Sequence, residues 1–333
     1  MFEKVLVEKE IAQHPQTLKI LSRLKQYPVQ LIDRYDQFWG QVKKPYLHKR
    51  ESLNLFIAQK RGELVKKAPE AYGTQGAQHY YYVHSYNCIY ECQYCYLQGY
   101  FKTPDLVFFV NHHEIIEQMQ KIADEQSDVW FHAGEFSDSL ALAHFSQELQ
   151  LYFDFFAKNP HCKLELRTKS ANISSLLALN ALENVYVTYS LSPSAIAKAI
   201  DLKTPAVSGR MAAMSQLASQ GYRLAVHFDP VVYHPDFAKL YQELLDQLFS
   251  QVPAESIAYY SLGVVRFTKD VYQEVVRNYP ESTLHSQEMI KSFDGKVRYP
   301  KPMRSWMLGT VKDQLMKRKI EKEKIYFCME ENQ

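Results

Sequence analysis

Three of the five cysteines in this 333-residue chain fall within eight residues: Cys88, Cys92 and Cys95. A structural zinc site uses four ligands, usually as two separated pairs, and this C-x3-C-x2-C run offers three. The candidates for a fourth ligand stand at no zinc-finger spacing: His84, Cys162 and Cys328. A redox C-x2-C pair would leave Cys88 without a role. An iron–sulfur cubane on three thiolates keeps one iron open for another ligand, so the spacing favours this cluster over zinc, redox or buried structural cysteines.

From residue 80 onward, short β-rich runs alternate with helical patterns. Strands are predicted over 79–85, 128–134, 162–168, 184–190, 222–229 and 256–265. Between them, apolar residues recur at three- and four-residue intervals over 113–126, 143–159, 208–221 and 237–251. This alternation predicts parallel βαβ units, in a partial barrel or a doubly wound sheet. Both architectures carry their chemistry at the carboxyl ends of the strands.

Polar or ionisable side chains follow every predicted strand. The cysteines follow the first strand, Glu135, Ser137 and Asp138 the second, Lys169 the third, Ser190 and Ser192 the fourth, His227 and Asp229 the fifth, and Arg266 the sixth. One polar strand end would mean little, because loops are polar in general. Six in succession predict the functional rim of a barrel.

Charge is distributed unevenly although the net charge is only +2. Residues 41–67 carry about +6 and residues 291–324 about +7, so the remainder is acidic. Such segments suit a phosphate-binding surface, while solvated helix faces are the plainer interpretation. No run reaches the roughly 18 apolar residues of a membrane span, and the charged start lacks a secretion signal. The sequence predicts a cytoplasmic protein without membrane contact, in a reducing compartment.

C-x3-C-x2-C followed by an aromatic residue resembles the radical S-adenosylmethionine (SAM) superfamily. The resemblance implies an α/β fold with a partial (β/α)6 TIM-type barrel. Cys88, Cys92 and Cys95 would hold a [4Fe–4S] cluster, and SAM would bind its open iron. Lys169 would bind the SAM carboxylate, and Glu135 stands where a Gly-Gly-Glu motif binds the amine. The other expected cofactor contacts are Ser137, Asp138, Ser190 and Ser192.

CQYCYLQ, LRTKSANISSLL, RFTKDVYQEVVRNYPESTL and GKVRYPKPMRSW resemble the spore photoproduct lyase family within that superfamily, over about residues 50–330. The family repairs a methylene-bridged thymine dimer in DNA. The resemblance implies DNA as partner, with an electron donor such as flavodoxin or ferredoxin. It implies substrate contacts from Arg266, and from Arg298 and Tyr299 at the tip of a basic hairpin. The expected division is an N-terminal extension over 1–75, the radical SAM core over 76–290, and the hairpin and helix over 291–333.

The main departure from the family lies after the second strand. The lyases have Ser-Cys-Thr-Ser-Asp there and donate hydrogen from the cysteine, whereas this chain has Glu135, a poor hydrogen-atom donor. The tyrosines of the proposed relay, Tyr94 and Tyr96, are present. Tyr96, Cys162 or Cys328 could donate instead, or the enzyme could modify another substrate, such as RNA or a small molecule. A DNA-binding protein with a structural or redox-sensing cluster is the alternative from another class.

Overall fold

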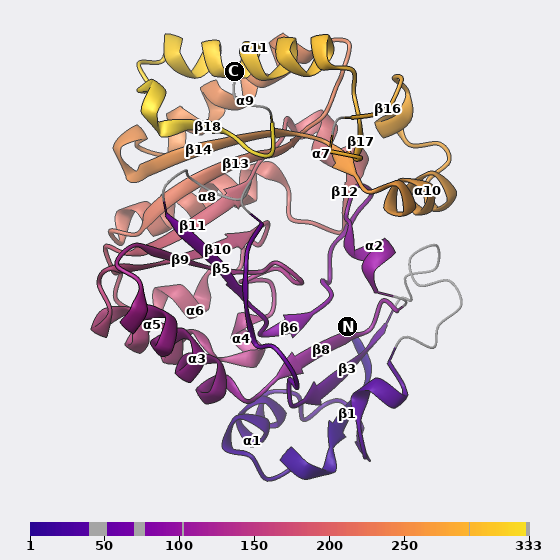
Figure 1. Ribbon diagram of the computed structural model, residues 1–333, viewed down its shortest axis with the longest axis vertical. Helices are drawn as coiled ribbons and strands as arrows, with labels where there is room; N and C mark the ends of the chain where they lie inside the picture. Colours follow the sequence, from indigo (N-terminus) through magenta and orange to yellow (C-terminus); the bar gives the residue numbers. More distant parts are fainter. Residues whose placement is uncertain (40–51, 70–76, 102, 293, 331–333) are drawn as a thin grey trace.

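The computed structural model describes residues 1–39, 52–69, 77–101, 103–292 and 294–330 (Figure 1). Its central sheet has the order β18-β14-β13-β11-β10-β9-β5-β4, and every neighbouring pair is parallel except β4 and β5. The strands are β4 Val65–Lys67, β5 Gln78–Tyr82, β9 Val129–Ala133, β10 Cys162–Thr168, β11 Val185–Ser190, β13 Arg223–Val231, β14 Ile257–Val264 and β18 Ile325–Phe327. A curved parallel sheet with helices on its outer side is a partial TIM-type barrel, so the predicted fold class is confirmed.

The six predicted strands correspond to β5, β9, β10, β11, β13 and β14. Strand β10 shows why they form: Leu164 and Leu166 are fully buried in the main core, and the residues between them face the other side of the sheet. Strand β18 adds a seventh parallel strand by pairing with β14. It was not predicted, since three residues behind a basic run carry no periodic signal.

Most helices cover the outside of the barrel, whereas α1 lies beside the strands of a second sheet and α2 follows the cysteines (Figure 1). The helices are α1 Pro15–Ser22, α2 Leu97–Tyr100, α3 His112–Glu125, α4 Ala143–Ser146, α5 Leu149–Lys158, α6 Ser174–Leu177, α7 Ser194–Ile200, α8 Val207–Ser219, α9 Phe237–Gln251, α10 Lys269–Asn278 and α11 Lys301–Lys317. The single helix predicted over 143–159 is broken, because Gln147 adopts a left-handed backbone with φ 56°. No helix within the described ranges is long and apolar enough to cross a membrane.

A second sheet packs beside the barrel, in the order β2-β1-β3-β8-β6. Its strands are β1 Phe2–Glu8, β2 Val29–Ile32, β3 Leu53–Ala58, β6 Ser85–Tyr86 and β8 Leu106–Phe109. The sheet therefore takes strands from both sides of the predicted boundary at residue 75, which itself lies outside the described residues, as do residues 41–51 of the first basic segment. The three-part division stays a prediction.

The C-terminal part forms a small hairpin and a long helix. Strands β16 Ile290–Lys291 and β17 Val297–Arg298 pair with each other, and β17 also pairs with β15 Arg266–Phe267 at the end of the barrel. Helix α11 packs along α9 at the top of the molecule in Figure 1. The hairpin is thus attached to the rim on which the predicted site lies.

Candidate active site

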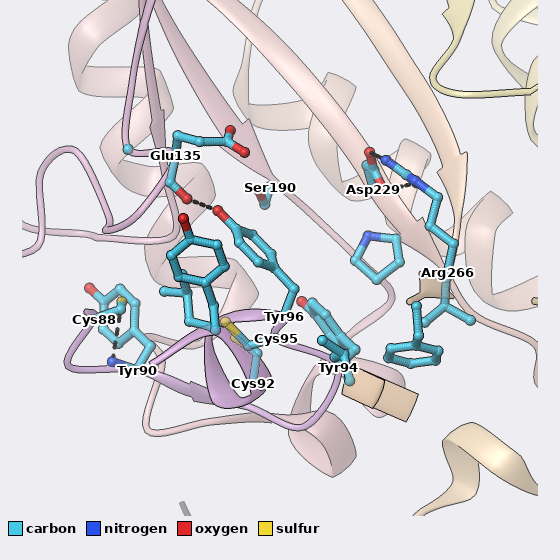
Figure 2. A pocket seen from close by; sticks show the side chains of 18 of the residues that line it. Cys88, Tyr90, Cys92, Tyr94, Cys95, Tyr96, Glu135, Ser190, Asp229 and Arg266 are labelled. Atoms are coloured by element: carbon cyan, nitrogen blue, oxygen red, sulfur yellow. Dashed lines mark hydrogen bonds and ion pairs between the residues drawn. The ribbon is translucent and has the colours of Figure 1, made fainter. Parts of the chain in front are cut away.

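A cavity of about 530 Å³ lies at the carboxyl ends of the barrel strands (Figure 2). Its walls include most of the predicted site residues: Cys88, Cys92, Cys95, Tyr94, Tyr96, Glu135, Ser137, Asp138, Lys169, Ser190 and Arg266. Three predicted residues are not part of its lining: Ser192, Arg298 and Tyr299. The rule that parallel strands bring their carboxyl ends together therefore placed most of the site.

The cysteine loop is fastened by contacts with distant parts of the chain. Strand β7 (Glu91–Cys92) pairs with β12 (Asp201–Leu202), so Cys92 lies opposite Asp201. The Tyr94 hydroxyl donates to the Asp201 carboxylate, which also binds the buried Arg210 guanidinium at 3.1 Å. The Gln98 side-chain amide donates to the Cys95 carbonyl at 3.0 Å. These contacts fix the backbone on which the three thiols stand.

The three cysteines fit a cluster held by three thiolates. All three line one cavity, whereas the possible fourth zinc ligands lie elsewhere. His84 pairs with Glu148 at 3.3 Å, Cys162 begins β10, and Cys328 contacts Arg266. Among the described residues, no three His, Cys, Asp or Glu side chains gather closely enough to hold a single metal ion. The three thiols thus share one cavity wall, as the ligands of a cluster on three thiolates would.

Asp138 organises the loops at the ends of β9 and β10. Its carboxylate accepts hydrogen bonds from the Thr168 hydroxyl at 2.7 Å and the Lys169 amide at 2.8 Å, and from two amides of its own loop. Burial lowers the pKa of Lys169, but electrostatic interactions with Cys92 and with the Asp201 carboxylate outweigh burial and raise it above its ordinary value. Lys169 thus presents a charged ammonium to the cavity, and Asp138 acts as its positioning residue.

Gly134 allows β9 to turn sharply at the cavity wall. Its φ is +85°, and an added Cβ would lie 2.6 Å from the Ser139 hydroxyl and 3.2 Å from the Arg167 carbonyl oxygen. Gly134→Ala is expected to destabilise the fold by about 1–3 kcal/mol and to weaken SAM binding, because the Asp138 loop must shift. Thermal denaturation and calorimetric SAM titration would measure both.

Gly221→Ala is the matched control. Gly221 also has a positive φ, +80°, but an added Cβ would meet no atom within 4 Å. This variant should show the backbone strain without the loss of SAM affinity. Equal SAM affinity in both variants would mean that the cavity wall tolerates the extra methyl group.

The Tyr96 hydroxyl donates to the backbone carbonyl of Glu135 across the cavity (Figure 2). On the other side of Glu135, Phe136 packs against Tyr81 and Tyr86 with ring centroids 5.7 and 5.8 Å apart. Gly134 and Phe136 fix the backbone, so the Glu135 side chain extends into the cavity. Tyr96 and Glu135 therefore meet at one wall of the cavity.

Arg266 forms a bidentate ion pair with Asp229 at 2.8 and 2.9 Å (Figure 2). It also donates to the Val264 carbonyl at 3.1 Å. Burial raises the pKa of Asp229, but Arg266 outweighs burial and holds it below its ordinary value. Arg266 thus lines the cavity as predicted, with its guanidinium engaged by protein acceptors.

The Asp229 ion pair should make stability depend on pH. Because the folded pKa is depressed, the pair stabilises the fold above the unfolded value of 3.8, and this contribution is lost as pH falls further. Urea denaturation should show wild type losing its advantage over Asp229→Asn below about pH 4, by at most about 1.4 kcal/mol per pH unit. A difference between the two proteins that stays constant from pH 6 to pH 3 would contradict this.

The expectation that Arg298 and Tyr299 lie at the hairpin tip is wrong. Both side chains are fully buried. The Arg298 guanidinium binds the Asp294 carboxylate, the Met329 carbonyl at 3.0 Å and Glu330 at 3.2 Å. These acceptors pair the charge, which would be costly to bury alone. The turn lies earlier, where the Ser292 amide donates to the Lys296 carbonyl at 2.7 Å, so Arg298 and Tyr299 lie inside the protein rather than at the tip.

Two further residues of the cavity wall were noticed in the sequence but not assigned to the site: Asp229, at the end of the fifth predicted strand, and Lys296, in the basic hairpin. Arg167 and Met329 were missed. Arg167 stands two residues before Lys169 and could have been found from its strand-end position, whereas Met329 comes from the segment after β18, which carries no such signal. Cys162 begins β10, at the far end of the barrel from the cavity. Cys328 is buried behind Arg266, with its Sγ 3.4 Å from the guanidinium.

Comparison with known proteins gives consistent results. A family model described as spore photoproduct lyase matches residues 43–326. The spore photoproduct lyase of Clostridium acetobutylicum is 22% identical over 309 residues, covering 90% of each chain. That of Bacillus subtilis is 23% identical over 290 residues, covering 82% of this chain and 85% of the relative. A solved spore photoproduct lyase complexed with dinucleoside spore photoproduct superposes with TM-score 0.84 at 20% identity, covering 98% of both chains.

Proposed function

Because this chain belongs to the spore photoproduct lyase family, and is thereby a radical SAM lyase with a [4Fe–4S] cluster, we propose that it repairs the spore photoproduct in DNA. One observation carries the proposal. A single cavity of about 530 Å³ joins the three cysteines, the Lys169 ammonium and the Tyr96 hydroxyl. A solved mutant of the family holds both AdoMet and dinucleoside spore photoproduct, and it superposes on this chain with TM-score 0.81 at 21% identity.

The cysteines would hold the cluster, which when bound supplies the electron that cleaves SAM to methionine and a 5′-deoxyadenosyl radical. Lys169 would bind the SAM carboxylate through a charge-assisted hydrogen bond. Ser190, on the same cavity wall, would bind a ribose hydroxyl, and Ser137 lies beside the Asp138 loop. Ser192 is buried outside the cavity lining, so we assign it no direct contact.

Tyr96 would donate the hydrogen atom that completes repair. The substrate radical gains the hydrogen of the Tyr96 hydroxyl, which forms a C–H bond and leaves a phenoxyl radical. An electron from the low-potential donor that reduces the cluster, with a proton from water, returns the phenol. Tyr94 would be the second member of the proposed relay. Its ring lies 5.4 Å from the Lys169 ammonium nitrogen, and its hydroxyl contacts Asp201. Glu135 would act as a hydrogen-bond acceptor in the cavity.

The proposed partners are DNA and a one-electron donor of the flavodoxin or ferredoxin type. The damaged bases must leave the duplex to reach the cavity, at a cost that is smaller for a damaged pair than for an intact one. Lys296 and the neighbouring hairpin residues would lie beside the entering strand. A reducing cytoplasm suits this chemistry, because none of the five cysteines is paired in a disulfide.

The test is anaerobic. The reconstituted and reduced protein is given SAM with DNA containing defined spore photoproduct, and 5′-deoxyadenosine and restored thymine are measured. Both products together support repair. Deoxyadenosine without thymine would show a radical enzyme with another substrate, the outcome that Glu135 makes worth examining. No deoxyadenosine from a fully loaded cluster would leave a DNA-binding protein with a structural or redox-sensing cluster.

A further inference from the structure

The inner face of the barrel is polar beneath the cavity. On β10, Glu165 and Arg167 alternate with the apolar residues that face the helices. Glu165 is 1% exposed, yet it is surrounded by donors from neighbouring strands. A carboxylate this deep is unfavourable unless it is paired and hydrogen-bonded, and none of the functions described above uses it.

Glu165 is the centre of a hydrogen-bonded network. The Tyr259 hydroxyl donates to its Oε1 at 2.7 Å, and the Arg167 guanidinium donates to its Oε2 at 3.0 Å. The rings of His132 and His227 approach the same carboxylate. Burial raises the pKa of Glu165, but Arg167, His132 and His227 outweigh burial and hold it well below its ordinary value. The Glu165 carboxylate stays charged and binds the Arg167 guanidinium on the side away from the cavity opening.

Arg167 connects this network to the cavity. It lies two residues beyond Glu165 toward the carboxyl end of β10, its side chain is 29% exposed, and it lines the cavity wall. Its backbone is also fixed, because the Arg167 carbonyl accepts from the Ser139 amide at 3.1 Å. Glu165 therefore directs a guanidinium into the cavity from the barrel side.

The other cations of the cavity have different positions. Lys169 adjoins the cysteine loop, where SAM would bind, and Lys296 enters from the hairpin. The Arg266 guanidinium is taken by both oxygens of Asp229. Of these four, Arg167 alone lies within a strand of the central sheet, β10, where it binds the buried Glu165. An extruded base that passes the loops would reach this inner side of the cavity. Thymine presents two carbonyl oxygens there, and a planar guanidinium is suited to donate to them.

We propose that Arg167 is a substrate-binding residue that donates to the base carbonyls of the lesion, and that Glu165 positions it. This inference deepens the proposed function and rests on it. The guanidinium would bind the bases rather than the phosphate between them. Loss of Arg167 should therefore weaken binding equally for the dinucleoside lesion, which lacks that phosphate, and for the dinucleotide, which has it.

The experiment uses the reconstituted protein with SAM bound. Arg167→Gln should weaken binding of both lesion forms about 10- to 100-fold, the value of a charge-assisted hydrogen bond, and change the SAM dissociation constant less than about twofold. The lesion affinity of Arg167→Lys should fall between that of the wild type and that of Arg167→Gln. Glu165→Gln should raise KM for the lesion without raising KM for SAM.

Glu8→Gln is the matched control for Glu165→Gln, because it also removes a buried carboxylate and leaves its arginine without that ion pair. Glu8 is also fully buried, binds Arg61 at 3.0 Å and accepts from the Tyr35 and Gln59 amides, but lies in the other sheet. It should lower thermal stability and leave both affinities unchanged.

Three outcomes would overturn the inference: unchanged lesion binding in Arg167→Gln, an equal loss of SAM binding, or a loss confined to the phosphate-bearing form. Failure of the proposed function is recognised separately, because the wild-type protein would then bind and convert neither lesion form. In that case the assignment of Arg167 to the lesion falls with it.

Discussion

Cys92→Ala is expected to bind less iron after anaerobic reconstitution and to form 5′-deoxyadenosine only at background level. With three protein thiolates, the loss of one leaves a cluster that the remaining two hold poorly. Cys92 is 8% exposed and lies in the β7–β12 pair, whose backbone hydrogen bonds do not depend on its side chain. The variant should therefore keep its fold. Iron content, the visible spectrum of the cluster and product chromatography would measure the effect.

Cys162→Ala is the control for this variant. Cys162 is fully buried at the start of β10, and its replacement should affect stability alone. A Cys92→Ala protein with full iron content and undiminished SAM cleavage would refute the assignment of the three cysteines. Equal losses in both variants would indicate that the damage comes from folding rather than from cluster binding.

Tyr96→Phe is expected to separate SAM cleavage from repair. The variant keeps the ring and loses only the hydroxyl that donates to the Glu135 carbonyl, so the cluster loop should keep its shape. Deoxyadenosine should still form, while restored thymine falls at least about tenfold, since the substrate radical lacks its hydrogen donor. The ratio of thymine to deoxyadenosine is the measurement.

Tyr100→Phe provides the comparison, because Tyr100 lines the same cavity and is 57% exposed. Its ratio should match the wild type. An unchanged ratio in Tyr96→Phe would assign the hydrogen donor to another group, and Tyr94 would be the next to replace. Loss of both products in Tyr96→Phe would mean instead that the hydroxyl mainly holds the cluster loop.

The barrel and most of its rim could be predicted because both depend on local pattern. Alternating apolar residues defined each strand, and parallel pairing then brought Lys169, Asp138 and the cysteines to one edge. The fate of Arg298 could not be predicted in this way. Its burial depends on Glu330, 32 residues away, and on the Met329 carbonyl, and local charge pattern contains no information on such partners.

The polar interior was missed for a related reason. In the sequence CKLELRT, the alternation of apolar and polar residues predicts that Glu165 and Arg167 lie on an exposed side of the strand. Only closure of the sheet turns that second side inward, where His132, His227 and Tyr259 from other strands meet Glu165. A period of two shows that a strand has two faces, but it does not show that both are buried.

The fastening of the cysteine loop also bears on the order in which the enzyme is assembled. In small zinc domains the metal organises the chain, so binding and folding are one event. Here β7 pairs with a strand more than 100 residues away, Asp201 joins Tyr94 to Arg210, and Gly99 leaves no room for a Cβ against Val271. These contacts come from the polypeptide itself. Iron and sulfide would therefore bind to a site that is already folded, and the apoprotein would be a folded intermediate on the way to the active enzyme.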